Sequence, residues 1–246
     1  MFIPLRAHVP TGRRPWANYA IILVTVTCSI WGFVDCHFLW AMSGFFPVPS
    51  GLPEVLRLAL GRATEMEQIL PMPVFVISST LVHGGWLHLA GNMLFLWVFG
   101  NAVNYKFGQA GYLVLYVLSA FISGVAFELF QGGPAIGASG AIYGVVGAFL
   151  VFFPRNDITA IWFHMLLVFR TFEISSVWVI LFWVGWDVLH LIWGSQGGVA
   201  YVSHVGGFAA GFGVALACAA IGWIRPTEDE QTLLEVLGLR KASDGP

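Results

Sequence analysis

Long apolar segments constrain this chain more than any other feature of its sequence. A helix needs ~20 mainly apolar residues to cross a bilayer. Segments of about that length occupy residues 18–40, 87–104, 112–130, 137–153, 176–193 and 200–224. Only 10% of the 246 residues are charged, whereas a soluble domain carries about 25%. The sequence therefore predicts an all-α polytopic membrane protein with six transmembrane helices.

The distribution of Lys and Arg predicts which helix ends face the cytoplasm. With the N-terminus inside, nine basic residues fall on cytoplasmic segments, and only Arg57 and Arg62 fall outside. Cytoplasmic loops of membrane proteins carry such an excess of basic residues. We therefore expect a membrane domain over residues 17–224, with cytoplasmic tails at 1–16 and 225–246.

One apolar segment is too short for a transmembrane helix. Residues 158–169 form a run of 12 bounded by Asp157 and Arg170, and we expect it to lie along the cytoplasmic surface. The alternative is a seventh crossing. That crossing would move His204 away from the membrane face that carries Ser139.

The first outer loop, residues 41–86, is long. Within it, residues 51–70 place apolar side chains near helical spacing, which predicts an amphipathic segment partly sunk in the outer leaflet. An ordinary loop helix explains the same pattern.

Polar residues at the ends of three apolar segments are the candidates for chemistry. Ser139 lies in the first turn of its predicted helix, where unpaired backbone N–H groups favour a developing oxyanion. His204 lies about one turn into the last helix and can serve as the base that a serine nucleophile needs. No acid occurs at that depth on these two helices, so the expectation is a Ser–His dyad. A purely structural histidine is the alternative.

His88 and Asn92 are spaced four apart, so they share one helix face. Both can donate hydrogen bonds to an anionic oxygen, although polar residues also join helices to one another in membranes. His83, in the loop before them, is a weaker candidate. Tyr143, four residues after Ser139, could support an imidazole or simply pack in the core.

Glycines accompany these polar residues. Gly137 and Gly140 would let a substrate backbone approach Ser139. Small residues also allow close helix packing, and this role extends along both helices to Gly140, Gly144, Gly147, Gly207 and Gly211. Such packing would press the Ser139 helix against the His204 helix. Two intramembrane acids, Glu128 and Asp187, receive no role.

Composition speaks against several other classes of protein. The formal net charge is −2, so no basic surface for nucleic acid is expected. Three cysteines, Cys28, Cys36 and Cys218, are an odd number, which disfavours a disulfide framework. No Cys/His spacing is typical of a metal site, and no Gly-rich phosphate loop precedes a helix. We expect neither a metal nor another cofactor.

Three motifs together resemble the rhomboid family of intramembrane serine proteases. They are HGGWLHLAGNMLFLW at 83–97, GASGAIYG at 137–144 and HVGGFAAG at 204–211. The resemblance covers about residues 15–224 and implies a six-helix rhomboid-like fold. It also implies a serine endopeptidase that acts on single-span membrane proteins near the outer face of a prokaryotic plasma membrane.

The resemblance assigns roles to individual residues. Ser139 would be the nucleophile and His204 the base, with the oxyanion hole formed by Asn92, His88 and the N–H of Ser139. Tyr143 would stack on His204. The first loop resembles the family's membrane-embedded loop, and the fifth helix its lateral substrate gate. The Trp-Arg dipeptide that many bacterial members carry in that loop is absent here, which leaves the anchoring of the loop open.

Two other functions compete with this interpretation. A catalytically inactive relative could bind transmembrane segments, but such relatives typically lose the serine or the histidine, and this chain keeps both. A transporter would predict broken helices or internal half-repeats near the midplane, and the sequence shows neither.

Overall fold

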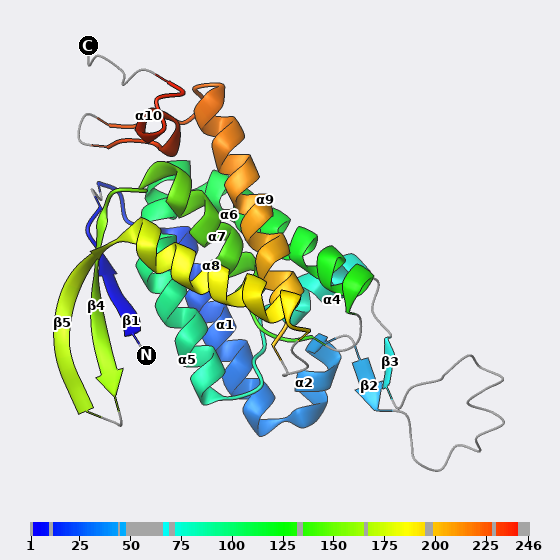
Figure 1. Cartoon of the computed structure of the whole chain (residues 1–246). Coiled ribbons are helices and arrows are strands. Elements are labelled where there is room, and N and C mark those ends of the chain that lie inside the picture. The colour runs from blue at the N-terminus through cyan, green and yellow to red at the C-terminus, as the bar shows by residue number, and fades with distance from the viewer. Residues whose placement is uncertain are drawn as a thin grey trace.

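The computed structural model describes residues 2–9, 12–43, 45–47, 66–68, 72–131, 135–164, 167–194, 199–227 and 230–240, and all structural statements concern these residues. This part of the chain is mostly helical (Figure 1). The helices are α1 (Trp16–Val34), α2 (Cys36–Ser43), α4 (Met72–Ser79), α5 (Trp86–Phe95), α6 (Asn101–Phe130), α7 (Ser139–Phe152), α8 (Ser176–Ile192), α9 (Tyr201–Ala220) and α10 (Leu233–Val236). The strands are β1 (Phe2–Ala7), β2 (Phe45–Pro47), β3 (Met66–Gln68), β4 (Asp157–His164) and β5 (Leu167–Ser175).

Helices occupy all the apolar segments predicted to cross the membrane. Within the described part of the chain, three helical runs are long and apolar enough to do so, namely Trp16–Val34, Trp86–Phe130 and Tyr201–Ala220, while α7 and α8 are shorter apolar helices. These long apolar helices are typical of an integral membrane protein. The count of six crossings stays a prediction.

The longest run, of 45 residues, combines α5, a π-helical segment η1 (Leu96–Gly100) and α6. Gly108 interrupts it with φ 71° and ψ 176°, a conformation in the left-handed region that glycine adopts without a steric penalty. This bend separates the two predicted segments, 87–104 and 112–130.

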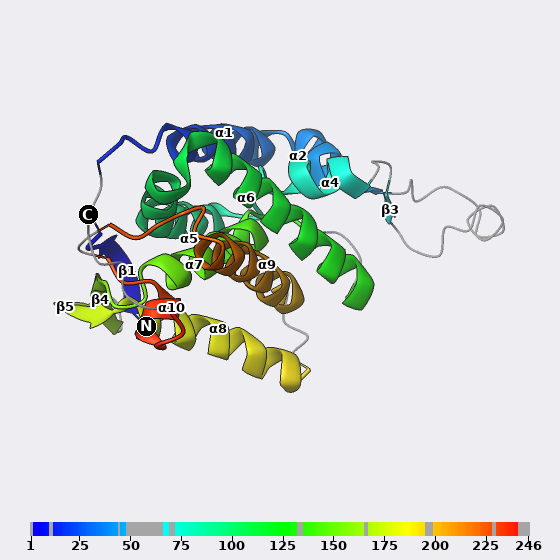
Figure 2. The same ribbon diagram turned by 90° about the horizontal axis from the view of Figure 1, so that it is seen from above.

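Helix α7 lies in the middle of the bundle and is its most buried helix (Figures 1 and 2). It contacts α9 along a line of glycines. A Cβ atom added to Gly207 would lie 1.9 Å from the Gly140 carbonyl oxygen, and one added to Gly211 would lie 1.8 Å from that of Gly144. The close approach that the small residues predict is therefore present.

Gly211→Ala tests this packing. The added methyl group would force α7 and α9 apart, so we expect the free energy of unfolding to fall by about 3 kcal/mol, the upper end of the usual cost of overpacking. Thermal unfolding in detergent measures the loss. Gly213→Ala on the same helix is the matched control, because its Cβ would meet nothing within 4 Å. Equal unfolding temperatures for the two variants would contradict the close packing.

The segment predicted to lie along the cytoplasmic surface is extended. Strands β4 and β5 form an antiparallel hairpin, and β1 pairs with β4, giving the order β1-β4-β5. The all-α expectation is wrong here. Buried Ile158 and Ala160 alternate with the less buried Thr159, and β-branched and aromatic residues favour such a pleated surface.

This hairpin also bears on the alternative of a seventh crossing. The Ser176 N–H donates to the Asn156 carbonyl at 2.8 Å, so the chain enters α8 beside the point where it left α7. The hairpin thus returns the chain to where the hairpin began, whereas a transmembrane segment would carry it to the other end of the bundle. The hairpin's pairing with β1 sets residues 2–7 beside it, as expected if both face the same side of the membrane.

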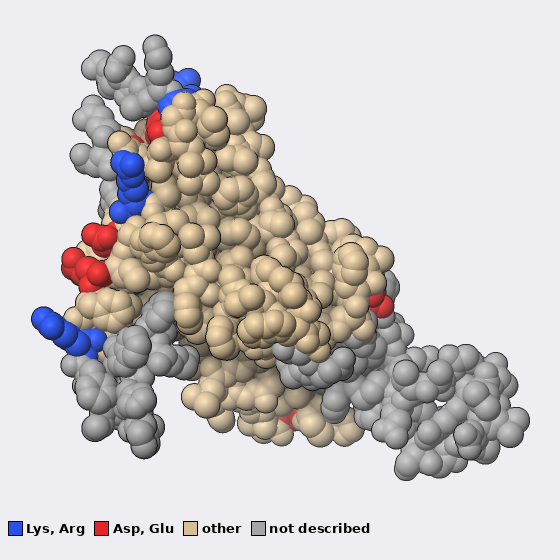
Figure 3. Space-filling model, viewed as in Figure 1, with Lys and Arg blue, Asp and Glu red and all other residues tan. Residues whose placement is uncertain are grey.

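The surface of the helices is apolar. Figure 3 shows most of the charged side chains of this face along the edge that carries the sheet and α10, with a broad uncharged area over the helices. Large side chains such as Leu23, Val114 and Trp178 are about two-thirds exposed, at 67%, 65% and 65%. Contiguous exposure of this kind marks a lipid-facing or partner-facing surface.

Only part of the long first loop can be compared with its prediction. The predicted amphipathic segment at 51–70 lies outside the described residues except for β3. That strand pairs antiparallel with β2, and α4 follows before the chain reaches α5.

Candidate active site

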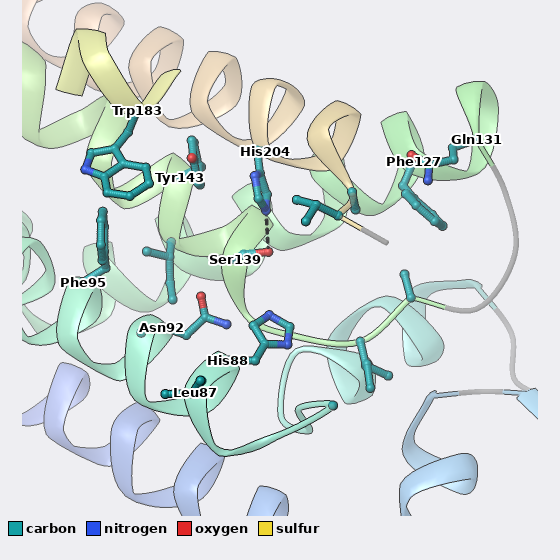
Figure 4. Close-up of a pocket in the computed structure, with 17 residues that line it drawn as sticks. Leu87, His88, Asn92, Phe95, Phe127, Gln131, Ser139, Tyr143, Trp183 and His204 are labelled. Atoms are coloured by element: carbon teal, nitrogen blue, oxygen red, sulfur yellow. Dashed lines mark hydrogen bonds between the residues drawn. The ribbon is translucent and has the colours of Figure 1, made fainter. Parts of the chain in front are cut away.

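Ser139 and His204 meet at the ends of two helices. Ser139 is the first residue of α7, and His204 lies in the first turn of α9. The Ser139 Oγ and the His204 Nε2 are 2.8 Å apart (Figure 4). The glycine contact between α7 and α9 holds the two helices close enough for this hydrogen bond. The structure thus brings together the serine and the base that the sequence selected.

Asp187 completes a chain of hydrogen bonds behind His204. Its Oδ2 accepts from the His204 Nδ1 at 2.7 Å, and the two side chains are only 6% and 12% exposed. The expectation of a dyad considered only the helices that carry Ser139 and His204, which have no acid at this depth. Asp187 comes from a third helix, α8. An acid inside an apolar helix was the signal that could have found it.

Tyr143 was expected either to support an imidazole or to pack in the core, and in the structure it contacts the imidazole of His204. Its ring stacks on His204 with centroids 4.4 Å apart and planes 10° from parallel. Tyr143 is one helical turn after Ser139 on α7, so the same helix carries both the hydroxyl and the aromatic support. The stack and the bond to Asp187 together restrict the orientation of the His204 ring.

His88 and Asn92 face Ser139 from α5 (Figure 4). A Cβ added to Gly137, two residues before Ser139, would lie 2.9 Å from the His88 Nε2 and 3.7 Å from the Asn92 Nδ2. The Asn92 Nδ2 is buried and has no hydrogen-bond partner within the described chain. An unpaired buried donor costs free energy, and an oxyanion beside it would remove that cost.

His83 lies behind the site and shapes its backbone. Its ring is fully buried, with Nδ1 3.0 Å from the Ser29 Oγ, and the Ala138 N–H donates to its Nε2 at 3.4 Å. Burial, together with the nearby His88 ring, lowers the pKa of His83 from 6.5 to about 3. A neutral ring that donates from Nδ1 and accepts at Nε2 suits both partners. His83 therefore anchors the residue before Ser139, with help from Ser29, which sequence reasoning missed.

The two glycines beside Ser139 pack against the protein itself. A Cβ on Gly140 would lie 2.3 Å from the Ser123 Oγ and 2.6 Å from the Ser203 Oγ, so the close packing that was one of the two roles expected of Gly140 is present. Gly137 has φ 118°, in the region that glycine favours, and sits against the His88 ring. A side chain there would press against His88 and approach Asn92.

These groups open into a cavity of about 720 Å³. Its wall combines polar and apolar side chains, including Leu87, His88, Asn92, Ser139, Trp183 and His204. At the side of the cavity, Phe95 of α5 and Trp183 of α8 make an edge-to-face contact with ring centroids 5.7 Å apart. The cavity is large enough to hold several residues of an extended peptide.

Comparisons with known proteins agree with this arrangement. The sequence model of the Rhomboid domain matches residues 72–221. Rhomboid protein 1, mitochondrial, from Saccharomyces cerevisiae is 35% identical over 171 residues, which are 65% of this chain and 46% of that protein. Rhomboid protease GluP from Bacillus subtilis is 30% identical over 147 residues, or 60% of this chain and 26% of that protein. Rhomboid protease GlpG from Klebsiella pneumoniae subsp. pneumoniae is 29% identical over 138 residues, or 56% of this chain and 46% of that protein.

The chain thus spans less than half the length of each of these relatives. The matched domain, however, covers more than half of this chain and contains Ser139, His204, His88 and Asn92. Its boundaries also enclose the helices that build the cavity. With a family match of this extent around this site, the chain belongs to the rhomboid family.

Proposed function

We propose that this protein is an intramembrane serine endopeptidase that hydrolyses peptide bonds in or next to transmembrane segments of membrane proteins. The observation that carries the proposal is the 2.8 Å contact between the Ser139 Oγ and the His204 Nε2 inside a cavity among apolar helices. A polar cluster of this kind is expensive in a membrane protein unless it is used. The rhomboid proteases among its relatives support the same activity.

The site supports acyl transfer in two stages. The Ser139 Oγ attacks the carbonyl carbon of the scissile bond while its proton passes to the His204 Nε2, and the carbonyl electron pair moves to the oxygen. When this tetrahedral intermediate collapses, the C–N bond breaks and His204 returns the proton to the leaving amine. Water then hydrolyses the acyl-enzyme by the same sequence of proton transfers.

The negative oxygen formed in each stage needs donors that are already in place. Asn92, His88 and the backbone N–H of Ser139 converge beside the serine and can supply them. The first N–H groups of a helix have no partner within the helix, and the positive end of the α7 dipole adds to their effect. No metal is required for this chemistry.

Membrane topology follows from the same proposal. Six crossings with both termini in the cytoplasm set the starts of α5, α7 and α9 at the outer face. The excess of basic residues on the opposite segments supports this orientation. The relatives include both a mitochondrial protein and bacterial ones, so the prokaryotic plasma membrane remains a prediction.

A transmembrane substrate would reach Ser139 from the side, between α5 and α8. The Phe95–Trp183 contact closes this route, in keeping with the gate role that the resemblance gives to the fifth helix. A peptide bond in a helix is already hydrogen-bonded, and breaking that bond in hydrocarbon costs several kcal/mol. The substrate would therefore unwind at the outer end, where the polar groups of the site can satisfy its backbone.

Labelling with a fluorophosphonate probe tests the nucleophile directly. We expect the purified wild-type protein to form a covalent adduct, and neither Ser139→Ala nor His204→Ala to do so. Adduct formation by Ser139→Ala would place the reactive group elsewhere. A wild-type protein that neither labels nor cleaves a single-span substrate would instead support an inactive relative that binds transmembrane segments.

A further inference from the structure

Asp187 is a buried acid on an otherwise apolar helix. The residue is 4% exposed and lies in α8, which is flanked in sequence by apolar residues such as Trp186 and Val188. A carboxylate at such a position costs several kcal/mol unless partners compensate it. The partner here is the imidazole of the candidate base, at 2.7 Å.

We propose that Asp187 is a positioning residue that orients the His204 base and stabilises its protonated form, so that the site works as an Asp–His–Ser triad. The inference rests on the proposed protease function and deepens it. It extends the expected Ser–His dyad to a three-membered chain of hydrogen bonds that runs across α8, α9 and α7.

The order of contacts carries the argument. The Asp187 Oδ2 meets Nδ1 of the ring, and the opposite nitrogen, Nε2, meets the Ser139 Oγ. Because a carboxylate only accepts hydrogen bonds, it holds the proton on Nδ1. Nε2 then presents its lone pair to the serine hydroxyl, which is the tautomer that a general base needs.

The carboxylate also acts after the proton has moved. Once Nε2 has taken the Ser139 proton, the ring is a cation 2.7 Å from a buried anion, and this attraction favours the charged intermediate. Asp187 itself stays ionised throughout, so no additional proton is transferred.

Tyr143 adds a further constraint on the imidazole. Its ring stacks on that of His204, which restricts the plane of the imidazole, while the hydrogen bond from Nδ1 to Asp187 restricts its rotation within that plane. The stack and the hydrogen bond together hold Nε2 toward the Ser139 Oγ.

Asp187→Asn tests the proposal because it keeps the size of the side chain and removes its charge. The Asn amide can donate to Nδ1 and so favours the tautomer protonated on Nε2, which cannot accept from Ser139. We expect kcat to fall about 10²- to 10⁴-fold and KM to change less than about threefold, because substrate binding does not use Asp187. Asp187→Glu, which keeps the charge, should recover part of the loss.

The matched control is Glu128→Gln, the same acid-to-amide change at an exposed site on α6. It should leave kcat unchanged. Both variants should unfold at the wild-type temperature. A loss of kcat in Asp187→Asn would then reflect a misoriented base and not an unfolded protein.

A double-mutant cycle separates positioning from a structural role. If Asp187 acts through the imidazole, Asp187→Asn should have no further effect on kcat in a His204→Ala background. Additive losses in that background, or wild-type kcat in Asp187→Asn alone, would overturn the inference while leaving the protease function intact. A wild-type protein with no cleavage and no probe labelling would overturn both.

Discussion

If the proposed protease function holds, Ser139→Ala is expected to lower kcat for cleavage of a single-span substrate by on the order of 10⁶-fold, as loss of the nucleophile does in serine proteases. The reason is that the acyl-enzyme route closes when Oγ is removed, and only orientation and the oxyanion donors remain. His204→Ala should cost nearly as much, because its Nε2 is the acceptor 2.8 Å from that oxygen. Cleavage rates in liposomes of defined composition give both values.

The double variant makes this prediction sharper. Residues that act as one unit show losses that do not add, so Ser139→Ala combined with His204→Ala should be no slower than the worse single variant. If the loss of kcat in the double variant equalled the product of the two single losses, the residues would act independently. The Gly213→Ala protein, altered far from any contact, should cleave at the wild-type rate.

Asn92→Ala is expected to lower kcat about 10²- to 10³-fold, the usual effect of removing one oxyanion donor. The structure supplies the reason, because the Asn92 Nδ2 is buried without a partner among the described residues and lies beside Gly137, near the nucleophile. A donor that is unpaired in the resting enzyme gains its hydrogen bond only when the oxyanion forms. KM should therefore change little.

Asn92→Asp distinguishes this role from helix packing. The carboxylate has nearly the same size as the amide but only accepts hydrogen bonds, and its charge opposes the oxyanion. We expect Asn92→Asp to be slower than Asn92→Ala. If the aspartate variant kept wild-type kcat while the alanine variant lost it, the side chain would matter for its volume, and the oxyanion role would be wrong.

The sequence alone located most of this site because the relevant relations are local. His88 and Asn92 share a face through their four-residue spacing, and Ser139, predicted in the first turn of the helix over 137–153, is the first residue of α7. The resemblance extended these local relations to Tyr143, whose ring stacks on His204. The catalytic roles themselves stay predictions for the experiments above.

The spacing of residues along one helix could not predict which residues of different helices are in contact. The pairing of Asp187 with His204 depends on how α8 lies against α9, which no periodicity within either helix reveals. The same limit applies to Gly140: its small size predicted a close helix contact, but only the structure showed that its neighbours are serines of α6 and α9. It also explains the β4–β5 hairpin, because an apolar run of 12 residues has no distinctive period until a partner such as β1 is beside it.

By itself, the sequence determined that this protein belongs in a membrane, which segments are helices, and at which helix ends its polar groups lie. These properties follow from hydrophobicity and from the backbone period of each segment. Only the tertiary structure decided which polar groups touch, because helices in a membrane associate through side-chain packing and not through the burial of an apolar face. The glycine contact of α7 with α9 sets the distance between Ser139 and His204, and the position of α8 gives the histidine its acid.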